Sequence, residues 1–587
     1  MGNVGIGGDN PIRVQSMITC DTMDTEASIQ QTMELANAGC EIVRITAPTV
    51  KDARNLENIV QGLRERGCDV PIVADIHFKP EAAMEAAKWV DKVRINPGNY
   101  ADSKKFVIRE YTDEQYAAEL NRIRERFSPL VDLCKKRGIA MRIGTNHGSL
   151  SDRILNRYGD TPLGMVESAL EFARIARDLD YHDFVFSMKA SNPKIMIAAY
   201  RLLVARLNEL GRDWNYPLHL GVTEAGEGED ARIKSAIGIG SLLADGIGDT
   251  IRVSLTEDSP HEIPVAEALI ENINTTSNSQ LSTLNSPLPF DPFSYQRRAT
   301  ETIAVAGIVD PGQGVKLGGS ELIRVVVSQA NFDKIAHKID KMGDYKPEIT
   351  YEKANVVEVD PRDEAAITKL NAERSSQFVT VTDDVDLAVI PAFRLLAARL
   401  QARHPILLKD VLDCRASVSD ASQDDGFLRI LLTASTNIGS LVCDGIGDAI
   451  LVQGEEAPGQ ALRLSYNILQ AAGSRIFKTD YVACPSCGRT LFNLQTTTAK
   501  IKAATSHLKG VKIAIMGCIV NGPGEMADAD FGYVGGAPSK VNLYVGKTAV
   551  KFNIPESEAV DRLKDLIREH GKWIEPAQRA ATLEVVT

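Results

Sequence analysis

Three cysteines near the C-terminal end of the chain have the spacing of a metal or cluster site. Cys484 and Cys487 lie in "CPSCG" with two residues between them, and Cys518 follows in "GCIVNGPGE" after thirty more. A structural zinc site would normally use four Cys or His ligands, and a redox dithiol would leave Cys518 without a role. The spacing therefore favours an iron–sulfur cluster held by three thiolates.

The fourth ligand position of such a cluster has a candidate in Glu525, seven residues after Cys518. The Gly-Pro turn in "NGPGE" should fold the chain back and bring this carboxylate near the cysteine. A carboxylate is a harder and more readily exchanged ligand than a thiolate, so this set indicates chemistry at one iron. The other interpretation of Glu525 is a solvated turn residue.

A second group of candidate residues lies at the ends of apolar, β-branched runs in the first 260 residues. A ring of guanidinium groups suits bidentate binding of phosphate or diphosphate oxygens. The alternative for any single arginine is a solvated strand residue or a structural ion pair. The group consists of Arg44, Arg94, Arg142 and Arg252, with Asp75, His77, Lys189 and Glu224 in equivalent places.

The elements that must position these residues alternate regularly between strands and helices. This alternation implies a parallel sheet, and eight strands in so short a stretch is the count of a TIM (β/α)₈ barrel. A doubly wound open sheet is the alternative. In a barrel, the carboxyl ends of all strands meet on one face, so the candidate residues would converge there. The expected strands cover residues 12–19, 41–46, 70–78, 91–98, 140–146, 184–191, 218–224 and 250–256.

An internal repeat indicates the fold of the middle of the chain. Residues 239–254, "IGSLLADGIGDTIRVS", match residues 438–453, "IGSLVCDGIGDAILVQ", at eleven of sixteen positions. The repeat predicts a second, degenerate barrel-like α/β copy, although it could also mark a single αβ corner. Because Leu451 stands in the place of Arg252, we expect the copy to be a scaffold rather than a catalyst.

The sequence thus predicts an α/β protein of three domains, in agreement with its length of 587 residues. Residues 1–265 would form the catalytic barrel, and residues 266–474 would form the inserted, structural domain. The stretch 274–294 is rich in Ser, Thr, Asn and Pro and is typical of a linker or long loop. Residues 475–587 would form a small α+β domain that carries the cysteines.

Composition excludes several classes of function. Hydrophobic residues make up 44% and charged residues 25%, as in soluble globular proteins, and no run approaches the roughly 18 apolar residues of a membrane span. A net charge of −12 argues against a nucleic-acid binder. The N-terminus has no signal-peptide pattern. We expect a cytoplasmic location, unless a transit peptide has been removed.

In eight ordered motifs the chain resembles the 4-hydroxy-3-methylbut-2-enyl diphosphate synthases, iron–sulfur enzymes of the non-mevalonate isoprenoid pathway. The resemblance covers residues 5–260 and 475–550, and the inserted domain is similar to that of the family's three-domain form. It implies that the cysteine-bearing domain is similar to a sulfite-reductase module. The motifs are "GGDNPIRVQSM", "VADIHF", "VRINPGN", "FSMKASN", "LGVTEAG", "GIGDTIRVSLT", "CPSCGRT" and "GCIVNGPGE".

The resemblance implies reductive ring opening and dehydroxylation of 2-C-methyl-D-erythritol 2,4-cyclodiphosphate to 4-hydroxy-3-methylbut-2-enyl diphosphate. Two electrons would come from reduced ferredoxin or flavodoxin through a [4Fe–4S] cluster, whose open iron would take a substrate oxygen in place of Glu525. Asp75, His77 and Glu224 would line the pocket, with Glu224 or His77 as the proton source.

The resemblance also implies two sets of binding residues. The cluster ligands would be Cys484, Cys487, Cys518 and Glu525. The substrate-binding residues would be Arg44, Arg94, Arg142, Asn146, Lys189, Thr223, Arg252, Ser254 and Asn521. The rival interpretation is a pterin- or phosphate-binding TIM barrel with a structural zinc tail.

Two assemblies agree with this resemblance. In two-domain relatives the cluster domain of one subunit closes over the barrel of its partner, which predicts a homodimer. The other hypothesis is that the inserted copy replaces a partner barrel and lets one chain close on itself.

Overall fold

The chain divides into two compact units, residues 1–475 with 485–489 and residues 476–484 with 490–587. The computed structural model describes residues 1–102, 110–276, 288–308, 314–412, 423–519, 524, 526 and 529–576. The predicted boundaries between three domains stay predictions.

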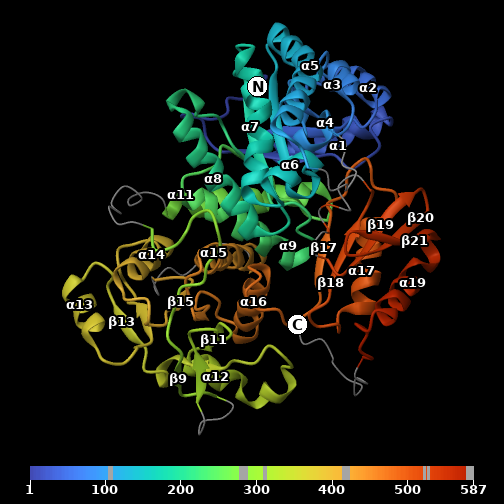
Figure 1. Cartoon of the computed structure of the whole chain (residues 1–587). Helices are drawn as coiled ribbons and strands as arrows, with labels where there is room; N and C mark the ends of the chain where they lie inside the picture. The colour runs from blue at the N-terminus through green and yellow to red at the C-terminus, as the bar shows by residue number, and fades with distance from the viewer. Residues whose placement is uncertain are drawn as a thin grey trace. The chain divides into compact units, whose positions relative to one another are not determined.

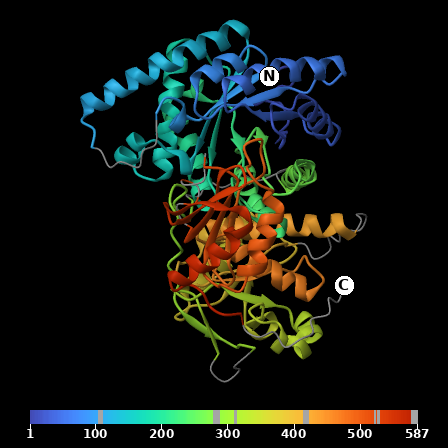
Figure 2. The same cartoon turned by 90° about the vertical axis from the view of Figure 1, so that its right-hand side faces the viewer.

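The first unit begins with a ring of eight parallel strands in the order β6-β5-β4-β3-β2-β1-β8-β7. A parallel bridge between Phe186 and Leu218 joins β6 to β7, which closes the ring. The predicted TIM barrel is confirmed, and the doubly wound sheet was the wrong alternative. Figure 2 shows the strands surrounded by their helices. The strands are β1 (Arg13–Met17), β2 (Ile42–Thr46), β3 (Ile72–Asp75), β4 (Lys92–Ile95), β5 (Ala140–Asn146), β6 (Phe184–Lys189), β7 (His219–Leu220) and β8 (Thr250–Ile251).

The barrel helices begin where the sequence supplies capping side chains. Thr49 and Asp52 form a reciprocal capping box at the start of α2, and Thr112 and Gln115 do the same for α5. Gly138 ends α5 in the left-handed conformation, at φ 65°. The helices are α1 (Thr25–Asn37), α2 (Val50–Glu65), α3 (Pro80–Ala86), α4 (Pro97–Tyr100), α5 (Asp113–Arg137), α6 (Asp152–Tyr158), α7 (Pro162–Asp178), α8 (Pro193–Leu210), α9 (Gly228–Ser235), α10 (Ser241–Ala244) and α11 (Glu262–Thr276).

The inserted region of the same unit contains six parallel strands. Strands β12-β11-β16-β15 form one sheet and β13-β14 a pair, and a bridge between Val379 and Ile406 continues the series from β15 to β14. An antiparallel hairpin, β9 (Ile303–Val305) and β10 (Val315–Leu317), precedes them. The six strands are β11 (Arg324–Val327), β12 (Ile349–Thr350), β13 (Val357–Val359), β14 (Val379–Val381), β15 (Leu407–Lys409) and β16 (Ala449–Leu451).

The strand order of the insert matches the barrel order β2-β1-β8-β7-β6-β5. The match extends to side chains: Glu41 pairs with Arg13 at 2.6 Å and accepts the Val14 N–H. In the insert, Glu348 pairs with Arg324 at 3.0 Å and likewise accepts the N–H of the next residue. Residues 351–356, all described, form a short turn that leads directly from β12 to β13. The insert is therefore a barrel copy that lacks the third and fourth strands and stays open.

The barrel and the insert contact each other through helices that occupy equivalent positions in the two copies. Arg201 of α8 binds Asp245 and Asp444, each at 2.8 Å. Its counterpart Arg394 of α14 binds the same two carboxylates at 2.7 and 2.8 Å. Because Asp245 and Asp444 occupy equivalent positions of the repeat, the contact has local two-fold symmetry.

Helix α15 forms much of this contact. Its residues 426–443 are long and apolar enough to cross a membrane by length and composition, but 61% of that window is buried inside the protein. The sequence-based statement that no run approaches a membrane span was wrong for this segment, because a helix packed in a protein core can have the length and mean hydropathy of a membrane span. The insert helices are α12 (Gln329–Ile335), α13 (Glu364–Ala372), α14 (Val389–Arg399), α15 (Gln423–Cys443) and α16 (Pro458–Ala471).

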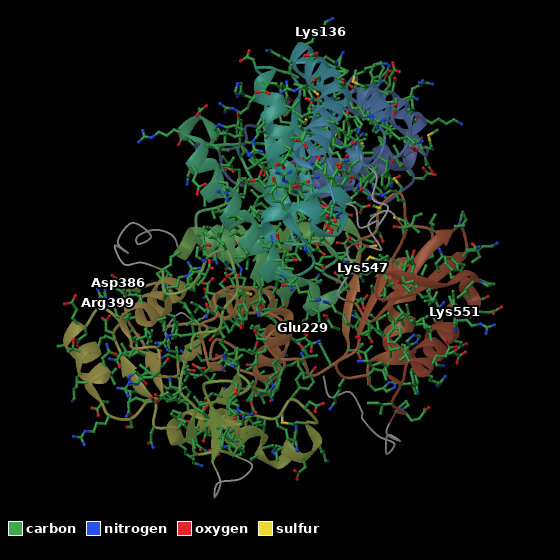
Figure 3. The ribbon with its side chains drawn as sticks, in the orientation of Figure 1. Lys136, Glu229, Asp386, Arg399, Lys547 and Lys551 are labelled. Carbon is green, nitrogen blue, oxygen red and sulfur yellow. The ribbon has the colours of Figure 1, made fainter. Side chains whose placement is uncertain are left out.

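A peripheral ion pair also joins the barrel to the insert. Glu229 of α9, labelled in Figure 3, pairs with Arg463 of α16 at 3.1 Å. Both side chains are partly exposed, so this pair contributes little compared with the buried arginine–aspartate contacts.

The second unit is a small α+β sheet, as predicted (Figure 1). Strands β17, β18 and β19 run parallel, and β20 and β21 continue the sheet antiparallel. Ile513 and Phe531 of the sheet pack against Leu563 and Ile567 of α19 in one apolar core. The elements are β17 (Asp480–Ala483), α17 (Leu494–Thr505), β18 (Lys512–Met516), β19 (Phe531–Ala537), β20 (Lys540–Val545), β21 (Thr548–Pro555) and α19 (Glu556–Glu569).

Candidate active site

The predicted pocket residues gather at the carboxyl end of the barrel strands, and all of them are buried. Barrel interiors are normally filled by branched apolar side chains, and polar groups are buried only at a cost. Such a concentration of charge indicates a binding site. The residues are Arg44, Asp75, His77, Arg94, Arg142, Asn146, Lys189, Thr223, Glu224, Arg252 and Ser254.

Asp75, at the end of β3, is the counter-ion of two arginines. Arg94 donates to its carboxylate at 2.9 Å, and Arg44 lies 3.7 Å away. Burial alone would raise the pKa of Asp75, but Arg94, His77 and Arg44 outweigh burial and hold this pKa well below its usual range. Asp75 is therefore ionised at neutral pH and does not supply a proton.

His77 lies between the same groups and is neutral. Burial is the main cause that lowers its pKa to about 3. The Nε2 atom of His77 lies 3.0 Å from Arg94, which can only donate, and 3.4 Å from the Asp75 carboxylate, which can only accept. With so low a pKa, His77 is a poor proton donor at neutral pH.

Arg94 is held in place by the backbone of β5. It donates to the Gly144 carbonyl at 2.9 Å and to the Asn146 amide oxygen at 3.3 Å. A Cβ atom at Gly144 would lie only 2.5 Å from Nε of Arg94. Glycine is required at this position because the guanidinium crosses directly over it.

Gly144→Ala is therefore expected to push Arg94 out of the pocket. We expect KM for the substrate to rise about tenfold, the equivalent of one lost charge-assisted hydrogen bond, with a smaller change in kcat. Steady-state kinetics measure this split. Gly459→Ala is the matched control, because a Cβ there meets no atom within 4 Å; equal KM values in both variants would contradict the assignment.

Arg252, directly after β8, is held by two residues that sequence reasoning missed. Glu262, the first residue of α11, accepts from Arg252 at 2.9 and 3.0 Å and from the Ser16 hydroxyl at 2.6 Å. The Met17 sulfur lies 2.9 Å from a guanidinium nitrogen of both Arg252 and Arg44. No motif points to Glu262, whereas Met17 lies in the "VQSM" strand that was quoted only for its pattern.

Lys189 and Glu224 complete the pocket on the side of β6 and β7. A Cβ atom at Gly221 would lie 2.7 Å from the Lys189 amine, so the amine crosses over that glycine. Burial, followed by the neighbouring arginines, holds the pKa of Lys189 well below its usual range. Burial likewise raises the pKa of Glu224, against opposing effects of Thr223, Lys189 and Arg252.

The backbone of Glu224 is also unusual. Its φ of 51° lies in the left-handed region that side-chain-bearing residues rarely adopt. One carboxylate oxygen has no hydrogen-bond partner among the described residues. A buried carboxyl group with a raised pKa keeps its proton to higher pH than an ordinary glutamate does.

The cysteines of the second unit follow adjacent parallel strands. Ala483 of β17 pairs with Ile515 of β18, so Cys484 and the loop that carries Cys518 emerge at the same sheet edge. The Gly517 N–H donates to the Cys484 sulfur at 3.1 Å, a contact that stabilises a thiolate and tunes clusters.

The other predicted residues of the cluster site lie outside this contact between Gly517 and Cys484. Cys487 is buried, three residues after Cys484, whereas Asn521 and Glu525 lie outside the described residues. Within the described part of the chain, no three His, Cys, Asp or Glu side chains lie close enough together to hold a metal ion. The chemistry of the donors, thiol sulfurs at one sheet edge with an amide donor, fits an iron–sulfur cluster better than a closed zinc site.

Five basic pocket side chains face three carboxylates (Asp75, Glu224 and Glu262), so the barrel defines a class of TIM-barrel protein that binds a small anion. Residues 1–267 match the family model described as GcpE TIM-barrel domain, and residues 480–569 match GcpE protein C-terminal domain. The chain belongs to the 4-hydroxy-3-methylbut-2-en-1-yl diphosphate synthases.

Similar proteins extend over nearly the whole chain. A 4-hydroxy-3-methylbut-2-en-1-yl diphosphate synthase (flavodoxin) from Akkermansia muciniphila is 59% identical over 98% of this chain and 96% of its own length. One of the same name from Chlorobaculum tepidum is 44% identical, over 98% and 89%. The chloroplastic, ferredoxin-named synthase of Oryza sativa subsp. japonica is 42% identical, over 98% and 87%. These matches confirm the predicted family, and the pterin or zinc alternative has no support among them.

Proposed function

We propose that the barrel pocket binds 2-C-methyl-D-erythritol 2,4-cyclodiphosphate and that the chain reduces it to 4-hydroxy-3-methylbut-2-enyl diphosphate. Two electrons come from flavodoxin or ferredoxin, the donors in the names of the relatives. The main support is the excess of buried cations in the pocket. A diphosphate brings negative charge to these cations, whereas a neutral substrate would leave them without a counter-charge.

The pocket residues act first in binding and orientation. Arg44, Arg94, Arg142, Lys189 and Arg252 bind diphosphate oxygens, and Asn146, Thr223 and Ser254 add hydrogen bonds. Because Glu262 occupies one fork of Arg252, this arginine binds through its remaining N–H groups. The anchored diphosphate fixes the methylerythritol carbons in one orientation and excludes water from the reacting bond.

Cys484, Cys487 and Cys518, with Glu525, would hold a [4Fe–4S] cluster, which would supply the one-electron reductions. Asn521 is a further residue that the family resemblance assigns to this site. The protein must also protonate the oxygen that leaves as water. Glu224 performs this step, since its pKa is raised, while Asp75 stays ionised and His77 stays neutral. The Nδ1 atom of His77, which has no hydrogen-bond partner among the described residues, makes a hydrogen bond to the substrate, and Asp75 holds Arg94 in position.

Glu224→Gln is expected to lower kcat by about 10² to 10⁴, the usual contribution of a general acid. The glutamine preserves the hydrogen bonds but cannot release a proton. Because the pKa of Glu224 is raised, the wild-type rate should fall as pH rises through that pKa, and the variant should lose this limb. Profiles of kcat against pH test both points. A variant that keeps the wild-type limb would place the proton source elsewhere.

The reaction and its cofactor are tested together by purification without air. The proposal expects a brown protein with broad absorbance near ~410 nm, about four irons per chain, and turnover of the cyclodiphosphate with a reduced flavodoxin. A colourless protein with about one zinc per chain and no turnover would overturn it.

The insert has a structural role in this proposal. Its counterparts of the pocket cations are apolar or neutral: Leu451 follows the register of Arg252, and Tyr351 that of Arg44. The insert packs on the barrel face around Asp245 through its own equivalent face around Asp444. One chain therefore supplies both sides of this two-fold contact. We therefore expect no recovery of activity when Arg252 and Cys518 variants are mixed and reassembled; recovery would indicate a homodimer that shares its site.

The expected cellular location is inferred from the names of the relatives. We expect the bacterial cytoplasm, or the plastid stroma if the chain, like the rice relative, is chloroplastic.

A further inference from the structure

Lys92 is a buried lysine of the barrel to which the pocket described above gives no role. It is the first residue of β4 and fully buried. Side chains alternate along a strand, so Lys92 lies on the same face as Arg94, two residues further on. Arg94 reaches Asp75 on β3 and Gly144 on β5, which makes that face the interior of the barrel. Lys92 therefore lies one layer below the anion pocket.

The surroundings of Lys92 contain charges of its own sign. The charged groups nearest to it are Arg142 from β5 and Arg44 from β2. After burial, Lys92 is among the charges that lower the pKa of His219 on β7. The amine has no hydrogen-bond partner among the described residues, and no carboxylate in the described chain lies within ion-pair distance of it.

Several buried polar atoms of the barrel strands have no hydrogen-bond partner among the described residues. Both amide atoms of Gln15, Nε2 of His219 and two guanidinium nitrogens of Arg142 have no partner in the described part of the chain. A buried ammonium without a counter-ion is strongly destabilising, and lysine avoids this cost by losing its proton. Burial, then Arg142 and Arg44, lowers the pKa of Lys92 to about 7.

The two arginines nearest to Lys92 are also the ones assigned to the substrate. A diphosphate bound to Arg142 and Arg44 neutralises the charges that repel a proton from Lys92 and brings negative charge within one side-chain layer. We propose that Lys92 takes up a proton when the cyclodiphosphate binds and so becomes a sixth cation of the substrate site. This inference rests on the proposed function, because it needs the cyclodiphosphate to occupy this pocket.

The proton balance of this step is simple. Water or buffer gives one proton to the neutral amine of Lys92 as the diphosphate enters, no covalent bond of the substrate changes, and the proton returns to solvent when the ligand leaves. Binding is thereby linked to pH: affinity falls as pH rises above the pKa of the empty site.

Calorimetric titration of the full-length enzyme with the cyclodiphosphate, without a reductant, tests the proposal. Titrations at pH 8 in two buffers of different ionisation enthalpy give the number of protons taken up. An amine with a pKa near 7 is only about one-tenth protonated at pH 8, so wild type should take up about 0.9 proton more than Lys92→Met. Methionine has a similar length and no charge, and it suits a buried site.

Two further variants make the result specific. Lys409→Met is the matched control: that lysine is also buried, but it pairs with Asp383 at 2.6 Å, so its loss should leave the proton count at the wild-type value. Lys92→Gln should behave like Lys92→Met and serves if the methionine variant does not fold. Between pH 7 and 9, Kd of wild type should weaken by up to about tenfold per pH unit relative to either Lys92 variant.

The possible results distinguish substrate binding in the pocket from protonation of Lys92. If wild type does not bind the cyclodiphosphate, the pocket assignment itself fails. If it binds and the Lys92 variants take up as many protons as wild type, with the same dependence of Kd on pH, the pocket stands and the role of Lys92 is overturned.

Discussion

Cys518→Ser is expected to yield protein without its full complement of iron and with activity lowered by at least ~10³-fold, the scale of losing one member of a catalytic unit. Cys518 is the only cysteine between β18 and β19 in the sequence, so no other thiol of that segment can replace it. Serine keeps the size of the side chain but is a poor ligand for iron compared with a thiolate. Iron analysis, absorbance and turnover measure the loss.

The barrel pocket should remain intact in this variant. The pocket side chains are held by contacts inside the first unit, such as Arg252 with Glu262 and Arg94 with Gly144. Calorimetry should therefore show binding of the cyclodiphosphate to Cys518→Ser. Cys68→Ser is the control, since Cys68 lies outside the cysteine set and should keep iron and activity. A Cys518→Ser protein with full iron and full turnover would remove Cys518 from the site.

The barrel and its pocket could be predicted because both depend on local pattern. Alternating apolar runs define strands, and a charged residue such as Arg94 or Arg142 inside such a run is costly to bury without a ligand or an ion pair. The carboxyl ends of parallel strands share one face, so the candidates had to converge once the barrel was recognised. The chemistry of the pocket was thus present in the type and position of individual residues.

The residues that were missed act through contacts that no local pattern encodes. Glu262 comes to Arg252 from the start of α11, and Met17 joins two arginines from different strands. Lys92 lies in the predicted strand 91–98, in which Arg94 was the only candidate site residue. The repeat predicted a barrel-like insert, but only strand pairing revealed that two strands are missing, because the segment between β12 and β13 is simply short.

Arg142→Met is expected to weaken binding of the cyclodiphosphate by about 30-fold or more while the folded protein becomes more stable. Arg142 is almost fully buried, and no carboxylate of the described chain lies within ion-pair distance of it. Burial, followed by Arg44 and Arg94, lowers its pKa well below the usual range, so the empty pocket bears the cost of this charge. The loss of one partner of a buried charge pair with the ligand corresponds to about 2–5 kcal/mol.

Arg394→Met should have the opposite effects, although it also removes a buried arginine. Arg394 binds Asp245 and Asp444, and its loss leaves buried carboxylates without a partner, at a cost of about 3–5 kcal/mol. The affinity of the folded fraction for substrate should not change. Thermal unfolding and calorimetric titration of the two variants measure both quantities. If Arg142→Met were destabilised like Arg394→Met, Arg142 would be a structural residue. A buried arginine that serves the ligand should instead lower the folding stability of the ligand-free protein.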